Sequence, residues 1–152
     1  MAVFQPIAFR IGNEHYGMDI SKVSAIENHL DVVRIPNSSP NIKGIINLRG
    51  EIIPVVDLKA KFGLLASATL SSRFIIVNLD NMRVAIEVDE VEEIHSVEED
   101  SLVEMPSIAT NSNCNYFYKV VKEDKMLILL IDPNKLLSQE EQEIAEKLAK
   151  EE

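Results

Sequence analysis

Short runs of alternating apolar and polar residues fill most of the chain. Such alternation is typical of a β-strand that buries one face, and two runs about a turn predict a hairpin. Two hairpins are predicted on this basis, with turns at Gly12–Glu14 and at Arg49-Gly50. The chain is therefore expected to fold mainly as β-structure.

The pattern of the first half of the chain recurs in the second half. A shift of 68 residues superimposes the apolar positions from Ile7 to Ile26 on other apolar positions, and a shift of 75 does the same for Ile52–Val56. This recurrence predicts two small β units in tandem, over about residues 1–63 and 72–131, which must pack together to bury their cores. Because alternation is common in β proteins, chance similarity is the alternative interpretation.

Helix signals follow the last strand of each unit and close the chain. Asp57 and Asp132 each stand where a side chain can cap a short helix. Ser138 and Glu141 form a capping box for an amphipathic helix over about residues 139–150. Short helices and one C-terminal α-helix are thus expected beside the strands.

The composition is that of a folded protein, with 46% apolar and 26% charged residues. Its net charge of −10 is uneven: +1 over residues 1–63, −7 over 64–138 and −4 over 139–152. Nucleic-acid phosphates and anionic lipids require clustered Lys and Arg, which the chain lacks, so neither is expected as a partner. Residues 87–104 hold nine acidic groups without the glycine of a calcium loop, and a solvated strand face is predicted there.

The location of the protein is predicted from what the sequence lacks. No apolar run approaches the roughly 18 residues of a membrane helix, and no basic region precedes a signal-like apolar stretch. Cys114 is the single cysteine and cannot form an internal disulfide, which suits a reducing compartment. A cytoplasmic protein without direct membrane insertion is expected.

Residues for catalysis or metal binding are not found in any recognisable spacing. The chain has no nucleophile elbow, dinucleotide loop or phosphate loop, and its three histidines are scattered. Cys114 has no neighbouring base, and Asp57 and Asp132 stand at cap positions, so incidental or structural roles are favoured over chemistry. We therefore predict no catalytic residue, no metal and no cofactor. A small enzyme or ligand-binding barrel is the alternative class, and it would require an enclosed polar pocket with convergent titratable groups.

The stretch Ile35–Gly63 is the most distinctive part of the sequence. Its central part, Ile42–Leu58, reads IKGIINLRGEIIPVVDL and surrounds Arg49 with apolar residues and turn formers. An arginine at a hairpin tip between apolar strands either clamps a nearby carboxylate or contacts a partner. The spacing alone favours the clamp.

This stretch resembles the signature of CheW, the family of bacterial chemotaxis coupling proteins. Tyr16–Val23 is similar to the opening hairpin and bend of that family, Arg34–Pro36 to its approach to the signature, and Met126–Leu137 to its closing strand and helix. The resemblance covers about residues 4–138. It implies one CheW-like domain of two tandem five-stranded SH3-like barrels packed about a shared hydrophobic interface, and it implies no catalysis.

The resemblance also implies partners and a binding site. CheW-like proteins bridge the cytoplasmic tips of methyl-accepting chemoreceptors to the regulatory domain of the histidine kinase CheA. The receptor groove between the barrels would involve six residues of this sequence, which are Val23, Gly44, Ile45, Asn47, Leu48 and Arg49. For Val23 a core position is the alternative, and for Gly44 a role in a turn.

The residue that pairs with Arg49 is left open. The family commonly has an acidic residue at the position that is Ala25 here, and alanine cannot form an ion pair. Glu27, on the same strand face, or Glu51 is expected to pair with Arg49 instead.

Arg73 and Phe74, at the start of the second unit, are candidate contacts for the kinase. As a function, the resemblance implies a noncatalytic adaptor that is recruited from the cytoplasm to receptor arrays at the inner face of the membrane. The alternative is a CheW-like module of a larger chemotaxis protein, such as the regulatory domain of the kinase or a coupling protein fused to a receiver.

Overall fold

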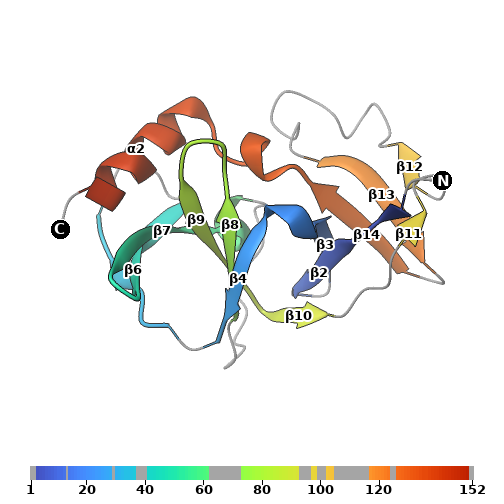
Figure 1. The fold of residues 1–152 in the computed structure, drawn as a ribbon, viewed down its shortest axis with the longest axis horizontal. Helices are drawn as coiled ribbons and strands as arrows, with labels where there is room; N and C mark the ends of the chain where they lie inside the picture. Colours follow the sequence, from blue (N-terminus) through green and yellow to red (C-terminus); the bar gives the residue numbers. More distant parts are fainter. Residues whose placement is uncertain are drawn as a thin grey trace.

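Two β-sheets lie side by side in the computed structural model, and a C-terminal helix lies against one of them (Figure 1). The structure describes residues 3–12, 14–28, 30–36, 41–61, 73–92, 97–98, 102–104, 117–123 and 126–150.

The central sheet, on the left in Figure 1, is built from the middle of the chain and has the strand order β4-β8-β9-β7-β6-β5. Its strands are β4 (Val23–Glu27), β5 (Val33–Arg34), β6 (Ile42–Leu48), β7 (Glu51–Asp57), β8 (Arg73–Asn78) and β9 (Arg83–Val88).

The terminal sheet combines two strands from the first 19 residues with four strands from residues 90–131, in the order β10-β2-β3-β14-β13-β12. Its strands are β2 (Pro6–Ile11), β3 (Glu14–Asp19), β10 (Glu90–Glu92), β12 (Leu102–Glu104), β13 (Phe117–Glu123) and β14 (Met126–Ile131). A separate strand pair joins β1 (Val3–Phe4) to β11 (Val97–Glu98).

The predicted helix signals are confirmed. The side chains of Asp57 and Asp132 accept backbone N–H hydrogen bonds at 3.2 and 3.1 Å, and Ser138 and Glu141 cap each other at 2.9 and 3.1 Å. The helices are η1 (Ile20–Lys22), α1 (Leu58–Lys61), η4 (Pro133–Lys135) and α2 (Gln139–Lys150).

Neither sheet is built from one predicted unit. The β2–β3 hairpin pairs with β14 in the terminal sheet, and the β8–β9 hairpin pairs with β7 in the central sheet. The predicted division into a unit over residues 1–63 and a unit over 72–131 is therefore wrong for the sheets, because the two halves exchange their hairpins. The exchange arises because β3 continues through η1 into β4, which pairs with β8, and β9 continues into β10, which pairs with β2.

The predicted recurrence is confirmed in the strand registers. Under the shift of 68, corresponding residues pair in the two hairpins, Ile7 with Met18 and Ile75 with Ile86. Under the shift of 75, β6–β7 corresponds to β13–β14, and both pairs have a register irregularity at the corresponding residues Ile42 and Phe117. Chance similarity does not explain an agreement of pairings, residue by residue, across both sheets.

A shared apolar core lies between the sheets. Successive side chains of a strand point to opposite faces of its sheet, so every second residue of a strand can point into this core. In β8, Phe74 and Ile76 pack inside the central sheet, whereas Ile75 and Val77 point into the shared core. Buried members of the shared core are Ile7, Phe9, Ile11, Tyr16, Met18, Val56, Leu58, Ile75, Val77, Val84, Ile86, Val88, Ile131, Leu136 and Leu137. The prediction of a mainly β fold is confirmed, and the predicted shared hydrophobic interface lies between the two sheets.

The central sheet also curls around a small core of its own. Ala25 from the edge strand β4 and Ile46 from β6, near the opposite edge, pack in one apolar cluster. Each sheet has six described strands rather than the predicted five, since the short edge strands β5 and β12 pair with β6 and β13.

Asp89 joins the two sheets at the point where β9 leads into β10. Its side chain is 2% exposed, and its carboxylate lies 2.7 Å from the Lys59 Nζ and accepts the Gly12 N–H at 2.7 Å. The prediction of a solvated face for residues 87–104 is therefore wrong at Asp89. The burial is stable because the carboxylate is both paired with a cation and hydrogen-bonded.

We expect Asp89→Ala to lower the free energy of unfolding by about 3 kcal/mol, because it leaves Lys59 and the Gly12 N–H without their carboxylate. Glu90→Ala is the matched control, since the Arg10–Glu90 pair at 3.0 Å involves a glutamate that is 58% exposed. Exposed pairs contribute about 1 kcal/mol or less. Urea unfolding of both variants measures the difference, and equal small losses would contradict the role of Asp89.

Alkaline pH should weaken the fold through Tyr16. Burial raises the pKa of the Tyr16 hydroxyl above its ordinary value of 10.0, and the negative charge of Glu14 raises it further. The folded chain then keeps a proton that the unfolded chain loses, so this stability is complete below about pH 10 and falls as the pH rises above it.

Tyr16→Phe removes the titrating group and should reduce this alkaline loss, whose slope for one proton is at most about 1.4 kcal/mol per pH unit. The measurement is urea unfolding of both proteins on either side of pH 10. Parallel pH profiles for the two proteins would show that Tyr16 does not contribute.

Candidate functional site

The Arg49 turn, residues Leu48–Glu51, forms the tip of the β6–β7 hairpin, as predicted. Both central residues adopt the left-handed backbone region, with φ of 52° at Arg49 and 91° at Gly50. Two such residues are typical of a type I′ turn, whose first central position favours Asn, Asp or Gly because most other residues are unfavourable in left-handed backbone. Asn47 supports the turn, since its Oδ1 accepts the Gly50 N–H at 2.9 Å.

Arg49 pairs with Glu27, so the structure selects one of the two predicted partners. The Arg49 Nη2 lies 3.5 Å from the Glu27 Oε2, whereas Glu51 pairs with Arg83 at 2.9 Å. The Arg49 side chain is nevertheless 76% exposed. Such an exposed pair contributes little stability, and most of the guanidinium stays open to a partner.

Gly44 lies where the edge strand β5 approaches β6 most closely. A Cβ at this position would stand 2.0 Å from the carbonyl oxygen of Val33 and 2.9 Å from the Cα of Arg34. Any other residue would therefore push β5 away from the sheet. Gly44 is buried, so it can affect a docking surface only by holding β5 in place.

Three other predicted groove residues lie in different apolar clusters. Val23 is half-buried beside the shared core, Leu48 packs against the core of the central sheet, and Ile45 packs with the residues beneath α2. The structure thus brings Asn47 and Arg49 together at the hairpin tip. It does not gather all six predicted residues in one groove.

The kinase candidates differ in exposure. Phe74 is 2% exposed and lies in the core of the central sheet, so its prediction as a direct contact is wrong. The strand alternation explains this, because Phe74 shares the inward face with Ile76. Arg73, the half-buried first residue of β8, stays a prediction.

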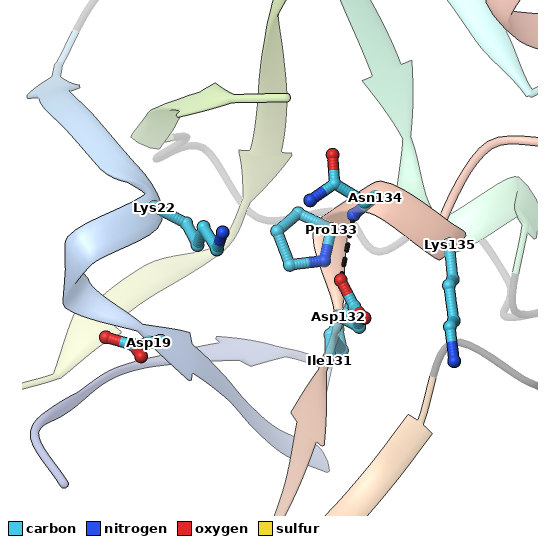
Figure 2. Close-up of a pocket in the computed structure, with 7 residues that line it drawn as sticks. All are labelled: Asp19, Lys22, Ile131, Asp132, Pro133, Asn134 and Lys135. Carbon is cyan, nitrogen blue, oxygen red and sulfur yellow. Dashed lines mark hydrogen bonds between the residues drawn. The ribbon is translucent and has the colours of Figure 1, made fainter. Parts of the chain in front are cut away.

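A depression of about 400 Å³ lies where η1 and η4 meet. Figure 2 shows Lys22 reaching from η1 toward Pro133, while Asp132 accepts the Asn134 N–H. Both charge signs and apolar surface line this junction depression, whose lining residues are Asp19, Lys22, Ile131, Asp132, Pro133, Asn134 and Lys135.

Strand β4 connects the junction depression to the Arg49 turn. Lys22 directly precedes the strand and Glu27 ends it, a span of about 17 Å at 3.3 Å per residue. Along the strand and one residue beyond it, exposed Ser24, Ile26 and Asn28 alternate with half-buried residues, and Ile26 is 44% exposed. An exposed apolar residue between two charged ends suits an amphipathic helix of about three turns.

Sequence reasoning missed the contribution of Lys22, Ile26 and Lys135 to this surface. The cap signal at Asp132 predicted the short helix η4 but could not indicate that η1 lies opposite, because the sequence does not reveal the exchange of hairpins. Nothing in the sequence indicates that Ile26 is exposed, since an isoleucine in an alternating run is normally predicted to be buried.

Neither metal ligation nor membrane spanning is indicated by the described part of the chain. No group of three or more His, Cys, Asp and Glu side chains in it could hold a metal ion. No helix in the described ranges is long and apolar enough to cross a membrane.

Comparisons with known proteins agree with this architecture. The family model of the CheW-like domain matches residues 5–141. The chain is 34% identical to the chemotaxis protein CheW of Klebsiella aerogenes, over 95% of this chain and 87% of that protein, and 33% identical to CheW of Treponema pallidum, over 91% and 84%. The crystal structure of the scaffolding protein TtCheW from Thermoanaerobacter tengcongensis superimposes with a TM-score of 0.81 at 32% identity, over 89% of this chain and 92% of that one.

These matches and the paired six-stranded sheets define a CheW-like domain. The chain belongs to the CheW family.

Substitutions at Arg49 should separate stability from binding. Arg49→Asn should leave the free energy of unfolding unchanged or raise it by up to about 1 kcal/mol, because asparagine tolerates left-handed backbone better than arginine. Arg49→Ala also loses the Glu27 pair and lacks the short polar side chain that lets asparagine adopt left-handed backbone, so it should be the less stable variant. Thermal unfolding measures both, and a loss well above about 1 kcal/mol in Arg49→Asn would show that the guanidinium mainly clamps the hairpin.

Proposed function

We propose that this chain is a noncatalytic adaptor that couples methyl-accepting chemoreceptors to the histidine kinase CheA in bacterial chemotaxis. Membership of the CheW family supports the proposal, as do the names of the relatives, which are chemotaxis proteins and a scaffolding protein. The relatives are aligned over most of their own length, so the likeness is to whole chemotaxis proteins rather than to one module of a larger one.

The observation that carries the proposal is the conformation and exposure of Arg49. An arginine with φ of 52° and a side chain 76% exposed is unfavourable for the turn and adds little to stability through Glu27. Strained, exposed residues of this kind are typical of functional positions. We infer that the guanidinium is retained to contact a partner, and that Asn47 and the outer face of β4 contribute to the same receptor surface.

Three of the remaining predicted groove residues, Gly44, Val23 and Leu48, then act indirectly. In this proposal Gly44 allows β5 to pair with β6, and Val23 and Leu48 fix the ends of the strands that carry the receptor surface. Substitutions there would alter coupling by moving the surface rather than by removing a contact.

The regulatory domain of CheA is the second proposed partner. Of the two predicted kinase contacts, Arg73 can reach a partner whereas Phe74 cannot, because Phe74 is in the core. We propose that the protein works in the cytoplasm and is recruited to receptor arrays at the inner face of the membrane.

The direct test is co-sedimentation of CheA with receptor-bearing membranes, with kinase activity measured in the pellet. The wild-type chain should bring CheA into the pellet and activate it, and Arg49→Asn should couple about tenfold more weakly, since buried interface arginines often dominate binding. Arg83→Asn is the matched control, because Arg83 is also exposed and paired with a glutamate.

Two results would contradict the proposal in different ways. If CheA pellets no better with the wild-type chain than without it, the adaptor function is wrong. If Arg49→Asn couples as well as Arg83→Asn, the adaptor function stands but Arg49 is not part of its receptor surface.

A further inference from the structure

The outer face of β6 is only partly open. Asn47 and Arg49 are exposed at its hairpin end, whereas Ile45, two residues before Asn47 and on the same strand face, packs against α2. A partner that contacts Arg49 and continues along β6 would meet α2 at Ile45. A helix of the same chain therefore covers the part of β6 that continues from the proposed receptor surface.

Helix α2 contacts this face through a narrow apolar stripe. Ile144, Ala145 and Leu148 pack on a seat formed by Ile35, Ile42, Ile45 and Met82, which we call the α2 seat. At the rim of the seat, the Nδ2 of Asn41 and the Nδ2 of Asn81 donate to carboxylates of α2 at 2.7 and 2.6 Å. The seat thus suits a helix with aliphatic residues four apart and acidic residues beside them.

The chain is anchored before α2 begins. Leu136 and Leu137 are buried in the shared core, and Ser138, which follows them, is exposed. Detachment of α2 would therefore leave both sheets and their common core in place. Segments that pack through few apolar side chains open at a lower free energy than the core does.

The internal repeat indicates that α2 is an addition to the central sheet. Phe117 corresponds to Ile42 under the shift of 75, and its ring stacks on Tyr16 with centroids 6.1 Å apart. In the terminal sheet this position is thus filled by a side chain of the sheet itself. In the central sheet the corresponding residue, Ile42, packs instead with Ala145 and Leu148 of α2.

We propose that α2 is a displaceable cover, and that an acidic amphipathic helix at a chemoreceptor tip takes its place on the α2 seat while it contacts Arg49. This inference rests on the proposed function and adds a regulatory step to it. The chain's own helix and the receptor helix compete for Ile45. The apparent affinity for the receptor is then the intrinsic affinity multiplied by the fraction of molecules in which α2 is open.

Hydrogen exchange of the full chain tests whether α2 opens separately, without any partner. The backbone amides of α2 should exchange about tenfold or more faster than those of β7, since local opening does not require loss of the sheets. Equal protection of α2 and β7 would overturn the proposal, because α2 would then leave only when the whole fold opens.

A binding experiment tests whether the receptor uses the α2 seat. Ala145→Glu places a charged side chain at a fully buried position and should release α2, whereas Lys147→Glu adds the same side chain at an exposed position of the helix. A purified cytoplasmic fragment of a chemoreceptor should bind Ala145→Glu about tenfold or more tightly than it binds the wild type, as expected if the open form is a minor state. Lys147→Glu should bind like the wild type.

Adding Ile45→Ala to Ala145→Glu should abolish the gain, because the uncovered seat then lacks a main apolar contact. Equal binding of the wild type and Ala145→Glu would overturn the proposal that α2 covers a receptor site, while leaving the adaptor function intact. Failure of the fragment to bind any variant would overturn both. Leu148→Ala is a milder releasing variant if Ala145→Glu does not fold, and it should raise affinity in the same direction.

Discussion

The exchange of hairpins between the two halves of the chain is the constraint on which the rest of the structure depends. Each sheet contains a hairpin from one half of the chain and four strands from the other half. Neither sheet can therefore form without both halves of the chain. The chain crosses between sheets at η1 and again at Asp89, whose buried carboxylate contacts Lys59 and Gly12. Surfaces on the two sheets are thereby held in a fixed relation, which is what an adaptor between two partners requires.

The proposed docking surface follows from that arrangement. Because β4 leaves the terminal sheet through η1 and becomes an edge of the central sheet, its outer face lies between the junction depression and the Arg49 turn. Ile26 exposes apolar surface along this path, and Arg49 supplies a charge at its end. The same curl that brings Glu27 to Arg49 encloses the core of the central sheet. Packing and recognition thus depend on the same strands.

Much of the fold could be predicted from the sequence, and the failures have physical causes. Alternation fixes strand register, so the repeat predicted by shifts of 68 and 75 residues agrees with the observed pairings. It does not fix which hairpin joins which sheet, because the two hairpins have the same pattern. Burial of Asp89 was hidden because Gly12, whose N–H it accepts, is 77 residues away. The stretch Ile42–Leu58 correctly predicted the Arg49 turn. The amphipathic pattern of residues 139–150 predicted a helix, but it cannot indicate that this helix packs on Ile45.

The central claim is that the two sheets form a single cooperative unit, and scanning calorimetry of the full chain tests it most directly. Shared strands and a shared core predict one unfolding transition whose calorimetric enthalpy equals its van't Hoff enthalpy. Asp89→Ala should lower the temperature of that transition without dividing it. Two resolved transitions in the wild-type protein, one for each sheet, would contradict the account.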